Sequence, residues 1–159
     1  MGISLALVAA LSYIDTIISS AVPIPGVRFG LANIVILAVL SRYDIPSAAV
    51  LSLLRSGFAG LTRGYTSGIM SLGGGILSFA ASVLLICVLG RSYRFSGIIA
   101  AVCHIIGQLA VSCILTGSLH TLLYAPVLIP AAVASGFLTG IAAEAVVKKS
   151  FKNTSHGKD

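Results

Sequence analysis

Charged side chains are scarce in this chain. Only 9% of its 159 residues are charged, and the acidic residues number four. Soluble domains of average composition carry about 25% charged residues, so this chain cannot cover a water-facing surface with charge. Its hydrophobic fraction of 57% and mean hydropathy of +1.08 instead indicate a small multi-pass membrane protein.

Clustered basic residues are also missing from most of the sequence. No lysine precedes Lys148, and the arginines stand singly between apolar runs. A nucleic-acid-binding protein needs a solvated face of lysine and arginine, so we expect no nucleic-acid partner. The net charge of +6 is better explained by orientation in a membrane.

Motifs of common enzymes are absent as well. The chain lacks G-x-x-x-x-G-K-[ST], so it cannot itself power transport by ATP. Its three aspartates are not adjacent, whereas enzymes that handle diphosphates through Mg²⁺ usually cluster carboxylates. The three cysteines stand singly within apolar runs as small hydrophobes. We therefore expect no enzymatic activity, and no catalytic residues, cofactor or metal site.

Six apolar segments, each bounded by glycine, proline or charge, predict an all-α membrane protein with a six-helix transmembrane bundle. They cover residues 2–21, 29–41, 46–63, 67–90, 95–117 and 121–147. We expect one transmembrane domain over 1–147, followed by a basic cytoplasmic tail over 148–159. A spanning helix needs about 20 apolar residues, so segment 29–41 is short. It either borrows from the preceding loop or forms a half-helix buried in protein, which in transporters often lines a binding site.

The positive-inside rule orients these segments. With the N-terminus inside, seven basic residues fall on the inner side and only Arg28 and Arg63 on the outer side. The seven are Arg42, Arg91, Arg94, Lys148, Lys149, Lys152 and Lys158. We therefore expect both termini in the cytoplasm and a bacterial-type inner or plasma membrane, with the tail beside anionic lipid.

Polar residues within apolar segments are candidates for function, because each charge there costs about 2.5–3.5 kcal/mol. Asp15 and Arg55 either form a structural ion pair, or Arg55 anchors an anionic ligand. Glu144 can pair with Lys148, four residues further on. His104 and Gln108 share one helix face, which forms either an internal hydrogen-bond network or a wall facing a substrate.

Small residues recur at i, i+4 spacing in three stripes, which allow helices to pack closely in lipid. The stripes are Gly2, Ala6 and Ala10; Gly60, Gly64 and Gly68; and Ala132, Gly136 and Gly140. Each stripe serves either packing within the bundle or docking of a partner membrane protein. The first stripe is the better candidate for docking.

Three motifs carry a resemblance to a known family. "IPGVRFGLANIVIL", "SLGGGILS" over 71–78 and "HIIGQLAVS" over 104–112 resemble the Gx transporter family, which is also labelled heptaprenyl diphosphate synthase component I. The resemblance covers essentially the whole chain. It departs from the usual motif at Ile105, where an asparagine commonly follows the histidine.

The family in turn is similar to the substrate-binding S components of energy-coupling factor (ECF) vitamin transporters. This similarity implies an outer lid over residues 23–30, with Pro23, Pro25, Gly26 and Arg28 as gate residues. It also implies docking, through Ala6 and Ala10, to a membrane T component with two ATPase subunits. Asn33 would then be the first polar residue below the lid.

We expect a substrate-binding subunit of an ECF-type importer for a small vitamin-like molecule or a quinone or isoprenoid precursor. The expected ligand contacts are Asn33, Arg55, His104 and Gln108. The alternative is a membrane partner subunit of a polyprenyl diphosphate synthase in quinone biosynthesis. A purely structural membrane scaffold is a third interpretation.

Overall fold

The computed structural model describes residues 2–20, 30–42, 44–90 and 92–155. Over these residues the protein is helical, with short turns between the helices. Six α-helices are present in the described part: α1 Gly2–Ser20, α2 Leu31–Arg42, α3 Ile45–Arg63, α4 Tyr65–Val83, α5 Tyr93–Thr116 and α6 Ala125–Ser155. A π-helical turn, η1 Leu84–Val88, extends α4, and a 3-10 helix, η2 Leu119–Tyr124, precedes α6.

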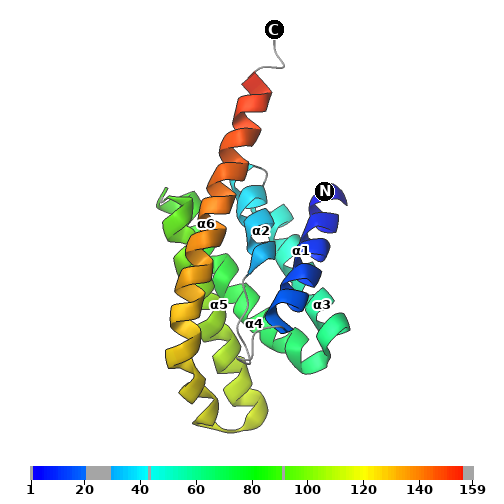
Figure 1. Ribbon diagram of the computed structural model, residues 1–159, viewed down its shortest axis with the longest axis vertical. Coiled ribbons are helices and arrows are strands. Elements are labelled where there is room, and N and C mark those ends of the chain that lie inside the picture. The colour runs from blue at the N-terminus through cyan, green and yellow to red at the C-terminus, as the bar shows by residue number, and fades with distance from the viewer. Residues whose placement is uncertain (1, 21–29, 43, 91, 156–159) are drawn as a thin grey trace.

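The helices form an elongated bundle (Figure 1). α5 packs most extensively, with α4 on one side and α6 on the other, and α3 packs on α4. α1 and α2 lie against α3, and α2 also contacts α6. The start of α1 and the C-terminal end of α6 lie at the same end of the bundle, and the turns from α3 to α4 and from α5 to α6 lie toward the other.

Four helical stretches of the described chain are long and apolar enough to cross a membrane. They are α3, α4 with η1, α5, and η2 with α6 up to Lys149. This confirms the expected all-helical architecture and supports a multi-pass membrane protein. Passage of all six helices through the membrane, and a cytoplasmic location of both ends, remain predictions.

α2 is a short helix enclosed by the rest of the bundle. Its 12 residues span about 18 Å at 1.5 Å per residue, well short of the roughly 30 Å of a hydrocarbon core. It contacts α1, α3, α5 and α6 and begins part-way along the bundle (Figure 1). Of the two readings of segment 29–41, the structure has the half-helix buried in protein.

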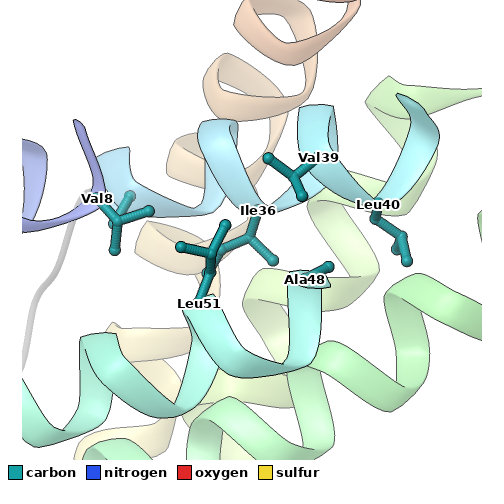
Figure 2. Packing of buried hydrophobic residues seen from close by; sticks show 7 residues of the cluster. Val8, Ile36, Val39, Leu40, Ala48 and Leu51 are labelled. Carbon is teal, nitrogen blue, oxygen red and sulfur yellow. The ribbon is translucent and has the colours of Figure 1, made fainter. Parts of the chain in front are cut away.

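Apolar side chains fix α2 in place. The cluster joins α1, α2 and α3 through Val8, Ala32, Ile36, Val39, Leu40, Ala48 and Leu51. Figure 2 shows Ile36 of α2 directed toward Leu51 of α3, with Val8 of α1 beside them. This packing holds the first turn of α2, which carries Asn33, at a fixed place between the other helices.

Glycines allow α4, α5 and α6 to approach within backbone contact. A methyl group at Gly107 of α5 would lie 2.7 Å from the carbonyl oxygen of Gly73 in α4. On the other side of α5, a methyl group at Gly97 would lie 2.5 Å from the carbonyl oxygen of Gly136 in α6. Such contacts exclude any larger residue, as expected for helix packing in lipid.

The three small-residue stripes have different environments. Gly68 packs on Gly60 where α3 meets α4, and Gly136 and Gly140 pack on α5. These two stripes therefore serve packing within the bundle. The stripe on α1 differs, because Gly2, Ala6 and Ala10 are all exposed.

Basic residues gather at the end of the bundle where α6 finishes. Glu144 accepts from Arg94 Nε at 2.7 Å and from Lys148 Nζ at 2.6 Å. The pair with Lys148 was expected, and the one with Arg94 was not. α6 continues as a helix through the expected tail as far as Ser155, and residues 156–159 lie outside the described chain.

We expect Gly107→Ala to destabilise the bundle. Its new methyl group would lie 2.7 Å from Gly73 O and 2.8 Å from Gly74 Cα, and overpacking of this kind costs about 1–3 kcal/mol. The matched control is Gly57→Ala in α3, where a methyl group meets nothing within 4 Å. Thermal unfolding in detergent should show a lower midpoint for Gly107→Ala alone. Equal midpoints would contradict the close α4–α5 contact.

Candidate ligand-binding site

Arg55 is the charged residue at the centre of the site. It lies on α3 with 6% of its surface exposed, and its Nη1 donates a hydrogen bond to Oδ1 of Asn33. Asn33 stands in the first turn of α2, where its backbone N–H donates to Gly30 O at 2.8 Å. Gly30 has a φ of +67°, a conformation that glycine adopts readily. The turn at Gly30 therefore positions Asn33 beside the guanidinium.

A small cavity of about 20 Å³ lies next to this pair. Four helices contribute to its lining: α2, α3, α5 and α6. The lining residues are Gly30, Asn33, Arg55, Ala101, His104, Ile105, Ala132, Ser135 and Thr139. The backbone N–H groups of the first turn of a helix carry partial positive charge, so the start of α2 and the Arg55 guanidinium both make this cavity electropositive.

Hydroxyl groups surround Arg55 on its α4 side. Ser52, Ser78 and Ser82 line a second small cavity, about 10 Å³ in volume, together with Asn33 and Arg55. Ser82 Oγ donates to the Ser78 carbonyl at 2.8 Å, leaving its oxygen available as an acceptor. Gly75 makes room for this group, since a methyl group there would lie 3.4 Å from Ser52 Oγ and 3.3 Å from Ser56 Oγ.

Arg55 also borders a cavity of about 20 Å³ that faces α1. Asp15 lines this cavity and is 4% exposed, and its negative charge acts on the guanidinium. The buried hydroxyl oxygens of Ser12 and Ser71, also in the lining, have no hydrogen-bond partner among the described residues. Arg63 and Thr16 also line this cavity, and Arg63 Nε donates to Thr16 Oγ1 at 2.9 Å. Arg55 thus connects α1 to the start of α2.

Gln108 lies apart from Arg55. His104 and Gln108 share the face of α5 that packs on Gly74, where a methyl group would lie 2.6 Å from the His104 carbonyl oxygen and 2.8 Å from Gln108 Cγ. His104 lines the cavity beside Arg55, whereas Gln108 lines a larger cavity of about 230 Å³. Three of the four expected contacts therefore meet in one cavity, and the fourth lies in the next.

The remaining expected residues are distributed as follows. Ala6 and Ala10 are exposed on α1. The expected gate residues lie outside the described chain; they are Pro23, Pro25, Gly26 and Arg28. The sequence reasoning missed Ser135 and Thr139, which α6 contributes to the Arg55 cavity. Their i, i+4 spacing in an apolar helix was an available signal, the same one that singled out His104 and Gln108.

The chemistry of the lining favours a ligand group that accepts hydrogen bonds. It offers a guanidinium, an amide, hydroxyls and helix N–H groups, and charge-assisted hydrogen bonds from arginine to an anion are among the strongest in proteins. Within the described residues, no group of three or more His, Cys, Asp or Glu side chains comes together to hold a metal ion.

Comparison with known proteins provides the family. A family model described as "Heptaprenyl diphosphate synthase component I" matches residues 3–146. A search of curated proteins and a search of solved structures each found no match. Because the family model spans nearly the whole helical bundle, including every residue that lines the Arg55 cavity, the chain belongs to the heptaprenyl diphosphate synthase component I family.

Proposed function

We propose that this protein is the substrate-binding membrane subunit of an ECF-type importer. Its ligand is a small molecule with an anionic group, either vitamin-like or a quinone or isoprenoid precursor. The observation that carries the proposal is the buried Arg55, which donates to Asn33 in the first turn of α2 and lines a small cavity between four helices. The function is binding rather than catalysis.

The energetic argument rests on the cost of Arg55. A charge within a span costs about 2.5–3.5 kcal/mol on the insertion scale, and well-packed apolar residues often match or exceed the stability that a buried ion pair gives. Stability alone therefore does not explain why an arginine rather than an apolar residue occupies position 55. Its retention beside an electropositive helix start is explained by an anionic group that occupies the cavity during function.

Docking is the second part of the proposal. An importer subunit without its own ATP site needs ATPase partners, and an S component reaches them through a membrane T component. The stripe of Gly2, Ala6 and Ala10 is exposed, while the other two stripes are used within the bundle. Close helix packing in lipid needs small residues, so this stripe suits a partner helix.

Arg55 offers a physical link between the two parts. On one side it contacts Asn33 of α2, and on the other it shares a cavity with Asp15 of α1. An anion bound to the guanidinium would compete with the Asp15 carboxylate for the positive charge of Arg55. The attraction between Arg55 of α3 and Asp15 of α1 would then weaken. Ligand occupancy would thereby influence the helix that carries the docking stripe.

A second candidate function is a membrane partner of a soluble polyprenyl diphosphate synthase. The family description favours it, because it names the protein as one component of such a synthase. In that case the polar interior would receive a lipid product, and the basic end near Arg94 and Lys148 would face the soluble subunit. The proteins that co-purify with the chain distinguish the two functions.

Arg55→Met tests whether the guanidinium holds an anionic ligand, with ligand retention as the readout. The substitution removes the guanidinium, and with it the opposite charge that acts on the buried Asp15, so the unfolding midpoint in detergent should fall. Hydrogen bonds to charged groups contribute about 1.5–3 kcal/mol, so retention of an anionic small molecule should fall about ten- to hundredfold. Mass spectrometry of molecules released from the gently purified protein measures this retention.

The control for that experiment is Arg94→Met, which removes an arginine at the end of the bundle, outside the cavity lining. It should leave retention unchanged. The scaffold interpretation also predicts a lower unfolding midpoint for Arg55→Met, but it predicts that neither the unsubstituted protein nor the variant retains a small molecule. That pattern would reject the binding function.

Substitutions in the α1 stripe should disrupt docking alone. Ala6→Leu and Ala10→Leu place bulk on an exposed face, so they should leave the unfolding midpoint unchanged but abolish co-purification of a T component and ATPases. Ala134→Leu, which is exposed on α6, is the matched control and should retain the partners. If the T component and ATPases co-purify equally with all three variants, the α1 stripe has no docking role. If a soluble synthase subunit co-purifies in place of the ATPases, the alternative function is favoured.

A further inference from the structure

The cavity beside Gln108 is the largest among those that line the helix interfaces described above. It is a half-open cavity with a volume of about 230 Å³, compared with about 20 Å³ for the cavity beside Arg55 and His104. α4, α5, η2 and α6 all contribute to its walls, through Met70, Ile105, Gln108, Leu109, Thr121, Tyr124 and Leu128. No charged residue is in this lining, and most of the wall is apolar. We call it the Gln108 chamber.

Gln108 has hydrogen-bonding capacity that the protein does not use. Its side chain is 94% buried, with 6% exposed, and it makes no hydrogen bond to the residues that the structure describes. Buried amides are almost always hydrogen-bonded in native proteins, and Gln108 borders the chamber, where a ligand oxygen could accept a hydrogen bond from its amide. Thr121 and Tyr124 line the same chamber, with Tyr124 51% exposed at its open edge.

The chamber adjoins the Arg55 cavity. Ile105 lines both, and Gln108 follows His104 by four residues, which is about 6 Å along the axis of α5. On α6, Leu128 lines the chamber and Ala132, four residues on, lines the Arg55 cavity. The two cavities are therefore neighbours along α5 and α6, with the Ile105 side chain between them.

We propose that the Gln108 chamber is the second compartment of the binding site and takes an uncharged, ring-sized apolar group that carries a carbonyl or hydroxyl oxygen. The oxygen accepts from the Gln108 amide, with Thr121 as a second donor. This inference rests on the proposed function, because it makes the ligand amphipathic, with an anionic end at Arg55. A wholly polar ligand would make no use of the apolar wall. The chamber, at about 230 Å³, is smaller than the volume of about 300–1,000 Å³ typical of pockets for drug-sized ligands, so it suits a group of about one ring.

A pair of probes that differ in one oxygen tests the chamber. The full chain in maltoside micelles is titrated with acetophenone and with ethylbenzene, and saturation-transfer NMR gives each dissociation constant after subtraction of empty micelles. A buried amide that gains its hydrogen bond should favour acetophenone about tenfold. Gln108→Leu should remove this preference while the binding of ethylbenzene persists.

Two further variants make the outcome decisive. Thr121→Val keeps the shape of its side chain and should weaken acetophenone binding by about threefold, which covers the case in which Gln108→Leu fails to fold. Ser112→Ala removes a buried hydroxyl one turn along the same face of α5, outside the chamber lining, and should change nothing. Equal affinity for the two probes, or an acetophenone preference that survives both Gln108→Leu and Thr121→Val, overturns the proposal.

Failure of the chamber and failure of the importer function give different results. Acetophenone has no anionic group, so its preference over ethylbenzene reports on the chamber, whereas retention of an anionic molecule reports on Arg55. If the acetophenone preference is absent while Arg55-dependent retention and ATPase partners are present, only the chamber inference fails. If the preference is present but a synthase subunit co-purifies, the chamber stands and the importer function fails.

Discussion

A guanidinium enclosed by helices must be compensated by nearby polar groups, and much of this bundle is arranged around that requirement at Arg55. Asn33 accepts its hydrogen bond, serine hydroxyls of α3 and α4 surround it, and Asp15 supplies opposite charge from α1. Each of these groups comes from a different helix or a different turn. The position of Arg55 therefore depends on how α1, α2, α3 and α4 pack. A substitution of Arg55 would in turn alter the interactions that all four helices make with it.

Glycine packing provides the second constraint. Backbone contact at Gly73, Gly107, Gly97 and Gly136 brings α4, α5 and α6 so close that little space remains between them. The remaining space is found beside Arg55 and, where η2 turns into α6, at the Gln108 chamber. The same close packing that stabilises helices in lipid thus determines where cavities remain in the bundle.

The sequence was sufficient to predict the helices, and it singled out polar residues that the structure places beside cavities, whose role as ligand contacts stays a prediction. Low charge and long apolar runs predicted the all-helical architecture, and helical spacing placed His104 and Gln108 on one face. Spacing could not show that the two residues line different cavities, because this depends on which neighbouring helix each one faces. It also could not show that the α1 stripe points outward while the stripe on α6 points inward, since both have the same i, i+4 pattern. The brevity of α2 was visible in the sequence, but its enclosure by four helices required tertiary structure.

The most direct test of a ligand held at Arg55 is an electron cryo-microscopy structure of the protein isolated at its native level from its own cells. The account predicts non-protein density that contacts the Arg55 guanidinium and the first turn of α2 and extends past Ile105 toward Gln108. It also predicts a partner transmembrane helix packed on Ala6 and Ala10. An Arg55 cavity that holds only water, together with a soluble subunit bound at the basic end of α6, would contradict it.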